Sequence, residues 1–372
     1  MTTLQRGMDF RRPEYRWEVF LRFYEFHLNY RAHPGLVYQF IPYLSSYFGW
    51  HLEERLWYAT INAFTQHPMT SLAIFQRQPE PFSNAAEVGD FWAWFDDHWF
   101  QLPFDTDRKY QKKECPVAMH RVSQLLWDSY GTLKQLYTGS FTGLWQRMRR
   151  ELYSLGRLGA WSGLEFIKIA AGSELQIDFD SLMLRDIDGS KSHRNGLCIL
   201  MGRDDLDWHE KLNPHFTGKY TEDEFAWLEE SGARLLAEAR ERFANRDFIH
   251  HVGYETLEST LCCYKSWHRP NRRYPNVYSD MAYGRLLDTA QKNPALDLTP
   301  FWEARREYLP RELRIEDNPQ HPQHGKIALD RGAQNLYRHT GRIHTMGVLF
   351  DCFEGPPQKG EKYVQNRIPE RD

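Results

Sequence analysis

The stretch TEDEFAWLEESGARLLAEARERF, residues 221–243, contains the clearest helix in the sequence and sets the fold class. Thr221 can accept a hydrogen bond from the backbone N–H of Glu224, whose carboxylate can bond back to Thr221. This reciprocal capping box marks a helix start. Apolar residues then recur at helical spacing. The stretch therefore predicts a helix over 222–244.

Segments of the same kind occupy most of the chain. The segment EYRWEVFLRFYEFHLNYRAH, residues 14–33, places Trp17, Phe20, Tyr24 and Leu28 on one helical face before the breakers Pro34 and Gly35. Few segments alternate with period two, so we expect a mostly α protein. Further helices are predicted over 51–66, 85–99, 116–137, 142–154, 160–171, 254–267, 279–291, 299–308 and 328–339.

The residues 172–221 form the longest stretch without helical periodicity. We therefore place a soft lobe boundary there. Long irregular segments in compact domains are also usually functional or disordered. Short extended pieces are expected around 197–201 and 346–353. The prediction is one helical unit over 1–345, with two lobes around a cleft, followed by a tail over 346–372.

Composition narrows the class of protein. The chain has 372 residues, of which 41% are hydrophobic and 15% aromatic, and its net charge is -3. Any contact with nucleic acid must then come from local basic clusters. Five cysteines, two of them the adjacent Cys262 and Cys263, make a poor disulfide framework, so we expect a reduced, cytoplasmic protein. No apolar run approaches the roughly 20 residues that span a bilayer, so we expect no membrane partner.

Two segments resemble known ligand-binding motifs but lack a residue that each motif requires. Asp186, Asp188 and Ser190 begin like a calcium loop, but Lys191 stands where the turn glycine belongs. GPPQKGEKY, residues 355–363, resembles a phosphate-binding loop, but Glu361 replaces its lysine. The sequence therefore excludes calcium binding and nucleotide hydrolysis by these two routes.

Three polar segments remain as candidates for binding. FDTDRKYQKKECP (104–116) and LCCYKSWHRPNRRYPNVYSD (261–280) interleave cations with aromatic rings, and DGSKSHRNG (188–196) gathers hydrogen-bond donors between two glycines. Cations among flat rings suit a phosphate backbone with stacking bases. Each segment alone is more typical of a solvated surface loop, but a shared cleft would explain all three.

These segments carry a resemblance. FDTDRKYQKKECPVAMHRV, DGSKSHRNGLCILMG and ETLESTLCCYKSWHRPNRRYPNVYSDMAYGRL, with LEERLWYATINAFTQ, resemble the phage amino acid:DNA transferase family over roughly residues 14–345. That family is related to the α-glutamyl/putrescinyl thymine pyrophosphorylases and to the helical domain of 5-hydroxymethyluracil DNA kinases. The resemblance implies a helical fold, distantly like that of DNA glycosylases.

The resemblance also implies an activity. The chain would be a transferase that replaces the pyrophosphate of 5-(pyrophosphoryloxymethyl)uracil in DNA with the amine of a free amino acid, such as glycine. The target base would be flipped out of the helix. A glycosylase-like enzyme acting on a modified base and a non-catalytic helical DNA-binding protein stay open as alternatives.

This activity assigns roles to residues. Asp280 or His193 would act as general base, with Asp280 equally placed to cap the following helix, and Lys265 completes the catalytic set. Gly189 and Gly196 would let backbone N–H groups form an anion nest. The predicted pyrophosphate ligands are Ser190, Lys191, Ser192, Arg194 and Asn195, and the predicted DNA or substrate contacts are Asp107, Arg108, Tyr110, Lys112, Tyr264, Arg269, Arg272, Arg273 and Tyr274.

A covalent route adds a nucleophile. A thiolate could add to C6 of the uracil and expel pyrophosphate, with Cys198, Cys262 or Cys263 as candidates and Cys262 as the first choice. Each is also typical of a buried core cysteine. No tightly bound cofactor is expected, although Asp186 and Asp188 could hold Mg²⁺ against the pyrophosphate.

Overall fold

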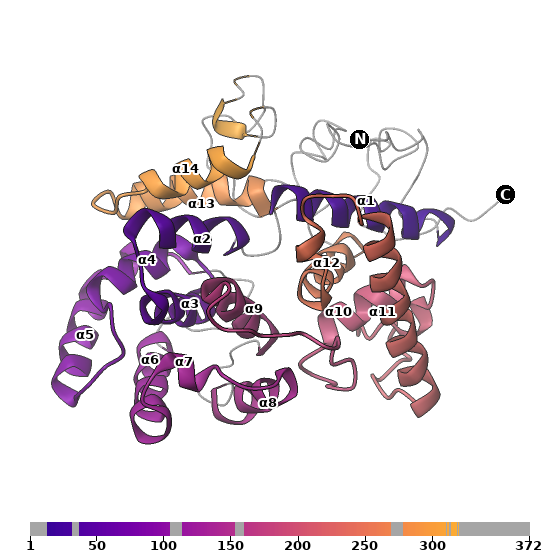
Figure 1. Ribbon diagram of the computed structural model, residues 1–372, viewed down its shortest axis with the longest axis horizontal. Helices are drawn as coiled ribbons and strands as arrows, with labels where there is room; N and C mark the ends of the chain where they lie inside the picture. Colours follow the sequence, from indigo (N-terminus) through magenta and orange to yellow (C-terminus); the bar gives the residue numbers. More distant parts are fainter. Residues whose placement is uncertain are drawn as a thin grey trace. The chain divides into compact units, whose positions relative to one another are not determined.

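The computed structural model describes residues 13–31, 37–104, 114–152, 160–268, 278–309, 311, 314–317 and 319. Within these residues all regular structure is helical and no strand occurs, so the mostly α prediction is confirmed (Figure 1). No helix among them is long and apolar enough to cross a bilayer. The chain divides into two compact units: unit 1 (residues 1–34, 179–284 and 309–372) and unit 2 (35–178 and 285–308).

Unit 2 is built around a buried helix, α3 (Leu52–Thr65), in which every residue from Leu56 onward is buried. It packs on α4 (Pro68–Arg77), α6 (Glu114–Leu125) and α9 (Ala160–Ala171). The segment over 285–308 also belongs to this unit, and its Phe301 packs edge-on against Phe40 with ring centroids 5.1 Å apart. The other helices are α2 (Val37–Phe48), α5 (Ala85–His98), α7 (Leu133–Leu136), α8 (Phe141–Arg147) and α14 (Thr299–Tyr308).

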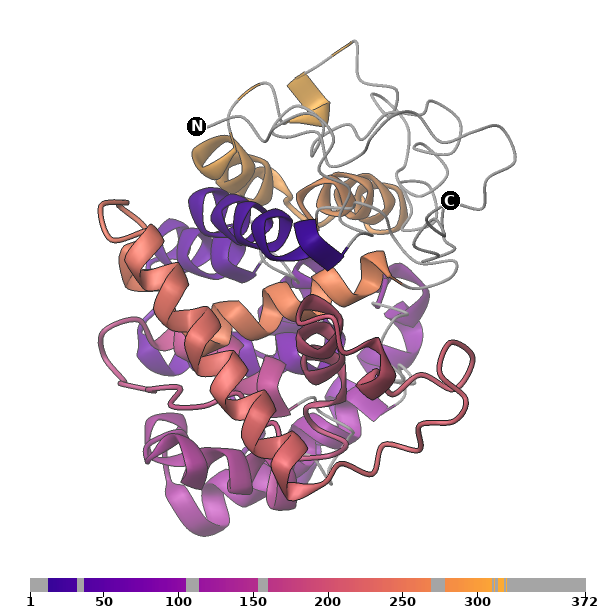
Figure 2. The same cartoon turned by 90° about the vertical axis from the view of Figure 1, so that its right-hand side faces the viewer.

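Unit 1 contains α1 (Pro13–Tyr30), α10 (Lys191–Leu200), α11 (Glu222–Arg242) and α12 (Tyr254–Trp267). Helix α12 packs on α10 and α1, and α11 packs on α10. Figure 2 turns this unit toward the viewer, with the long helix α11 in front. Helix α13 (Tyr278–Lys292) crosses the division between the units.

Most predicted helices are confirmed within a few residues. The capping box that begins α11 is present, with Glu224 N 3.2 Å from Thr221 Oγ1 and Thr221 N 2.7 Å from Glu224 Oε2. The predicted helices over 116–137 and 142–154 are interrupted by the π-helical turns η2 (Leu126–Tyr130) and η3 (Met148–Leu152).

Three helices were missed. Pro42 lies inside α2 and Pro68 begins α4, and proline is a breaker in most other contexts. The third is α10, whose first two turns are polar and contain Gly196. The extended piece predicted over 197–201 is wrong, because 197–200 belong to that helix.

Other predictions about organisation stay untested. The helix over 328–339, the extended piece over 346–353 and the tail over 346–372 lie outside the described residues. The single unit over 1–345, the two lobes, the cleft and the glycosylase-like arrangement stay predictions.

Polar side chains lie at the buried contact of α1 with α12. Tyr24 Oη is 2.7 Å from Thr256 Oγ1, and His27 Nδ1 is 3.4 Å from Thr260 Oγ1. One turn further along α12, the Tyr264 ring stands edge-on to Phe20. Burial lowers the pKa of His27 to about 3, because the apolar surroundings disfavour the charged imidazolium. The folded protein therefore keeps His27 neutral at neutral pH.

This depressed pKa predicts a loss of stability in acid. The stability contribution is complete above the ordinary pKa of 6.5 and declines as the pH falls toward 3, because only the unfolded chain readily takes the proton. At pH 5 the loss amounts to about 2 kcal/mol. Urea unfolding at pH 7.5 and pH 5 measures it. A His27→Gln variant should lose this dependence, and a variant of the exposed His215 (His215→Gln) should retain it.

Candidate active site at the crossing of α10 and α12

Helices α10 and α12 approach each other closely at Gly196. A Cβ atom placed on this residue would lie 2.3 Å from the carbonyl oxygen of Leu261, nearer than real Cβ atoms approach any backbone atom. Helix α10 can therefore rest directly on the backbone of α12. The first two turns of α10 are in this way laid against the middle of α12.

The buried side chains of α10 hold the loop that precedes it. His193 Nε2 lies 2.8 Å from the carbonyl oxygen of Leu182, and Ser190 Oγ donates to the carbonyl of Met183 at 2.6 Å. The guanidinium of Arg194, which is fully buried, donates to three further carbonyls of the same loop, at Leu184, Asp186 and Ile187. Three side chains thus fix the loop over 182–187.

The backbone conformation predicted for this segment, an anion nest between Gly189 and Gly196, is wrong. Gly196 lies inside α10 and serves the helix crossing, and the segment from Lys191 onward is helical. The side chains of Ser190 and Arg194 point to the loop carbonyls described above. The role of Ser190 and Arg194 as pyrophosphate ligands stays a prediction.

Asn195 and Lys191 together position Trp208. The Asn195 amide donates to the Trp208 carbonyl at 3.0 Å and accepts from the Trp208 N–H at 3.1 Å. The Lys191 ammonium lies 3.6 Å from the centre of the indole ring, a cation–π contact. A half-buried aromatic ring is therefore held beside the first turn of α10. Trp208 could not be identified from the sequence, because the segment that contains it lacks periodicity.

His193 and Glu258 form a buried pair. The carbonyl of Leu182 can only accept, so Nε2 of His193 carries a proton. Nδ1 lies 2.9 Å from Glu258 Oε1, so a second proton lies between these two atoms. Because both ring nitrogens are engaged in this geometry, His193 presents no lone pair to a substrate. Its predicted role as general base would require the ring to leave one of these partners.

A chain of three polar groups lies at the same crossing. Lys265 Nζ donates to Ser192 Oγ, and Ser192 Oγ is 2.9 Å from Cys262 Sγ. An ammonium group can only donate, so the Ser192 hydroxyl accepts from it and can pass its own proton toward the sulfur. All three residues are half-buried. We call this set the Lys–Ser–Cys chain.

The cysteines differ in their surroundings. Burial raises the pKa of the Cys115 and Cys198 thiols, and Cys263 is buried in the core. Cys262 is half-buried and touches a hydroxyl that itself contacts an ammonium. Of the three cysteines proposed from the sequence, Cys262 is the one with both access and polar partners.

The spacing on α12 explains why these groups meet α10 together. Glu258, Cys262 and Lys265 are four and three residues apart, which places them along one helical face. The segment ETLESTLCCYK contains this spacing. The sequence did not predict that this face meets a second helix, because α10 was expected to be a loop.

The carboxylates proposed for Mg²⁺ have a local structure. Asp186 Oδ1 accepts from the Gly189 N–H at 2.8 Å, which closes the turn before α10, and Asp188 is exposed. Among the described residues, no group of three or more His, Cys, Asp or Glu side chains could hold a metal ion. Mg²⁺ stays a prediction.

Other predicted site residues are placed only in part. Asp280 is the third residue of α13, and its side chain is outside the description. Tyr264 is fully buried against Phe20 and His268, as a core residue would be. Outside the described residues lie Asp107, Arg108, Tyr110, Lys112, Arg269, Arg272, Arg273 and Tyr274.

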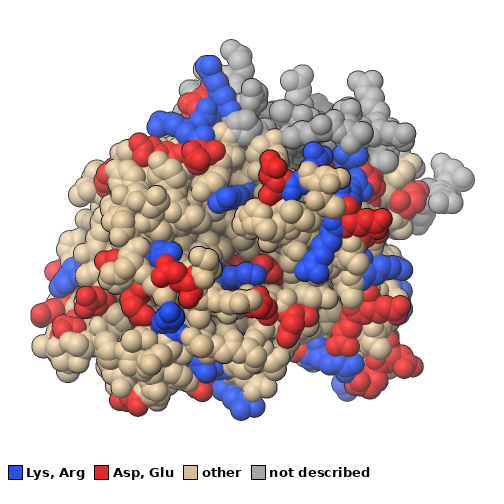
Figure 3. All heavy atoms as spheres, in the orientation of Figure 1, with Lys and Arg blue, Asp and Glu red and all other residues tan. Residues whose placement is uncertain are grey.

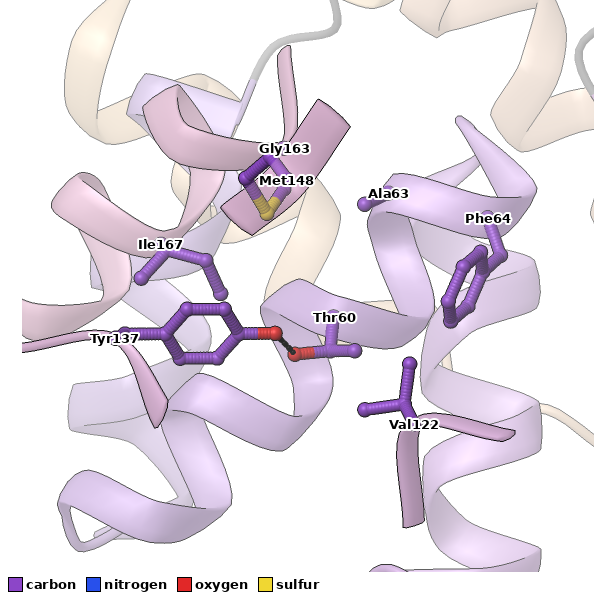
Figure 4. Close-up of a pocket in the computed structure, with 8 residues that line it drawn as sticks. All are labelled: Thr60, Ala63, Phe64, Val122, Tyr137, Met148, Gly163 and Ile167. Carbon is purple, nitrogen blue, oxygen red and sulfur yellow. Dashed lines mark hydrogen bonds between the residues drawn. The ribbon is translucent and has the colours of Figure 1, made fainter. Parts of the chain in front are cut away.

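Cavities are also found elsewhere among the described residues. In unit 2, Thr60 and Tyr137 line a cavity of about 10 Å³, and their hydroxyls are hydrogen-bonded at 2.8 Å (Figure 4). That space holds roughly one water molecule.

In unit 1 a cavity of about 290 Å³ is lined by residues 181–186, Glu229, Gly232 and Tyr254. Tyr254 is eight residues from Cys262, about 12 Å along α12. Neither cavity contains the Lys–Ser–Cys chain.

Charges are mixed on the face shown in Figure 3, where blue and red side chains are interspersed. Among the described residues, Arg185 pairs with Glu229 at 2.8 Å and Arg242 pairs with Glu18 at 2.6 Å. The described residues on that face therefore do not gather into a single basic stripe. The basic segments predicted to contact DNA are mostly outside the description.

Comparisons with known proteins identify the family. A family profile described as amino acid:DNA transferase matches residues 40–273. The chain therefore belongs to the amino acid:DNA transferase family, as the resemblance indicated. A protein of Salmonella phage ViI named serinyltransferase is 28% identical over 278 residues.

That alignment covers 72% of this chain and 66% of the phage protein, just under two thirds of the relative's length. No solved structure matches the chain. The profile match covers α10 and α12, and with them the Lys–Ser–Cys chain.

The helix crossing predicts a large penalty for Gly196→Ala. The added methyl group would collide with backbone, so α10 and α12 must separate, and we expect a loss of about 2–4 kcal/mol in the free energy of unfolding. Urea unfolding measures this loss. The matched control is Gly89→Ala in α5, where nothing lies within 4 Å and alanine should be neutral or stabilising. Equal stability of the two variants would contradict the crossing.

The buried pair predicts a difference between two substitutions of Glu258. Glu258→Leu leaves a buried imidazole nitrogen without its carboxylate, which should cost about 2–4 kcal/mol of unfolding free energy. Glu258→Gln keeps a hydrogen-bond partner and should cost less. Chemical unfolding of both variants is the measurement. The prediction fails if leucine is tolerated as well as glutamine.

Proposed function

We propose that this protein transfers an amino acid onto DNA, replacing the pyrophosphate of 5-(pyrophosphoryloxymethyl)uracil with the amine of a free amino acid. Family membership supports the transfer of an amino acid to DNA. The relative named serinyltransferase makes serine the first amino acid to test, and glycine, the smallest, is the second. The reaction forms a carbon–nitrogen bond at the C5 methylene and releases pyrophosphate.

The observation that carries the proposal is the hydrogen bond from Lys265 to Ser192 in the first turn of α10. The leaving pyrophosphate develops negative charge, which is stabilised by donors already fixed in place. The N-terminus of a helix presents unpaired N–H groups and a partial positive charge. Lys265 brings an ammonium to Ser192 in that turn, and Lys191 adds a second cation one residue earlier.

The roles of the predicted ligands follow from where their side chains lie. Lys191, Ser192 and Lys265 are half-buried, and we assign the pyrophosphate to the two ammonium groups and to the first turn of α10 at Ser192. Ser190, Arg194 and Asn195 act one step away, since they fix the preceding loop and Trp208. Asp280 remains our proposal for the base that takes the proton of the incoming amine. Flipping of the target base would bring the methylene to these groups.

The direct test is conversion of a defined substrate. The protein is incubated with DNA carrying 5-(pyrophosphoryloxymethyl)uracil and serine or glycine, and the nucleosides are analysed by mass. We expect the amino acid adduct and one pyrophosphate per modified base, with the DNA strands intact. Abasic sites would instead indicate a glycosylase. An unchanged nucleoside profile with every amino acid would overturn the proposal.

The pyrophosphate assignment predicts the effect of Lys265→Met. The variant retains the length of the side chain but not its charge, so kcat should fall by about 100-fold or more. Product formation under saturating amino acid measures this loss. Lys292→Met, which removes an exposed lysine paired with Asp288 in α13, is the matched control and should leave kcat unchanged. Similar rates for the two variants would contradict the assignment.

A further inference from the structure

From the Lys–Ser–Cys chain we infer that Cys262 is a covalent nucleophile, which bonds to C6 of the target uracil during the transfer. This inference rests on the proposed function and adds a reaction intermediate to it. Three observations carry the inference: the access of Cys262, its hydrogen-bonded connection to a cation, and the position of that cation at the proposed pyrophosphate site.

Access separates Cys262 from the other described cysteines. It is half-buried, whereas Cys115, Cys198 and Cys263 are buried. Burial also raises the pKa of the Cys115 and Cys198 thiols, which holds them protonated. Attack on a base requires a sulfur that the base can reach. Among the described residues this condition selects Cys262.

The hydrogen bonds around the sulfur suit a thiolate. The Lys265 ammonium donates to Ser192 Oγ, which leaves the hydroxyl proton of Ser192 to point at Cys262 Sγ, 2.9 Å away. Negative charge on the sulfur is then stabilised through one hydroxyl by a positive charge. A nearby cation that favours the thiolate over the thiol is a recognised way to activate a cysteine nucleophile.

The crossing of the helices fixes this arrangement. Ser192 comes from α10, and Cys262 and Lys265 come from α12. Gly196, one turn after Ser192, lets α10 rest on the α12 backbone at Leu261, the residue next to Cys262. The sulfur and the hydroxyl are therefore held together by backbone packing and not only by their own hydrogen bond.

The chemistry balances without an added oxidant or reductant. The Cys262 thiolate forms a bond to C6, and the electrons of the C5–C6 double bond move to O4 as an enolate. The enolate then expels pyrophosphate: the bond between the C5 methylene and oxygen breaks, and an exocyclic methylene conjugated with the C4 carbonyl remains. Lys265 lies where it can donate to the departing oxygen.

The second half of the reaction reverses the addition. The amine of the amino acid forms a bond to the methylene, which restores the enolate, and the amine loses one proton to a base. The enolate then expels the Cys262 thiolate, and the C5–C6 double bond returns. The covalent step turns displacement at a saturated carbon into addition to an activated alkene.

The test begins with the full-length protein and DNA carrying 5-(pyrophosphoryloxymethyl)uracil, without any amino acid. The inference predicts a protein–DNA adduct that survives denaturing gel electrophoresis. After nuclease and trypsin digestion, fragmentation of the peptide over 247–265 should place the nucleotide on Cys262 and not on Cys263. A competitive isotope effect with deuterium at C6 should be inverse, because that carbon becomes tetrahedral.

Variants then separate the inference from the proposed function. With serine or glycine present, Cys262→Ala should lose product formation by at least 100-fold and form no adduct, and Cys262→Ser is the second, near-isosteric variant. Cys115→Ala, in unit 2, should behave as the unchanged protein. Ser192→Ala should slow adduct formation and shift its pH profile while DNA binding is retained.

Two outcomes contradict the inference. If Cys262→Ala forms product at a rate close to that of the unchanged protein, or the C6 isotope effect is unity, Cys262 is not a nucleophile and the transfer is a direct displacement. The proposed function would then stand. If the unchanged protein makes no product with any amino acid, both the function and the inference are overturned.

Discussion

The close packing of α10 on the backbone of α12 is the constraint on which the site depends. Only glycine at position 196 allows the carbonyl of Leu261 to approach so closely. From that contact the order of the neighbouring side chains follows: His193 meets Glu258 on one side of the crossing, and Ser192 meets Cys262 and Lys265 on the other. One backbone contact therefore sets both the buried pair and the Lys–Ser–Cys chain.

Helix α12 serves two partners through two faces. Thr256, Thr260 and Tyr264 face α1 and complete the polar and aromatic contacts of the core. The other face carries Glu258, Cys262 and Lys265 toward α10. Such a division places reactive groups on a rigid element, and precise sites are more easily held on helices than on loops.

Burial also divides the polar residues of the segment before and within α10. Arg194, His193 and Ser190 are used internally, where they bind the carbonyls of the loop over 182–187. Buried carbonyls need such partners, since an unpaired polar group in the core is costly. Lys191 and Ser192, which lie between Ser190 and His193, are only half-buried. Some donors of this segment therefore stabilise the fold, and Lys191 and Ser192 belong to the candidate site.

The sequence predicted much of this and failed where tertiary contacts decide. The mostly α class and the helices α11 and α12 follow from periodicity and from the Thr221 capping box. Helix α10 could not be predicted from propensity, because its stability comes from buried hydrogen bonds to the loop that precedes it and from a glycine that permits close packing. Cys262 and Lys265 were identified as residues of interest, but their connection through Ser192 depends on a contact 70 residues apart in the chain.

The most direct measurement of the central claim is a double-mutant cycle for product formation with Ser192→Ala and Lys265→Met. If the helix crossing joins these residues into one catalytic unit, the double variant should be about as slow as the slower single variant, because each substitution already breaks the chain. If the two losses multiply as independent effects, Ser192 and Lys265 act separately, and the account of a single Lys–Ser–Cys chain at the crossing is wrong.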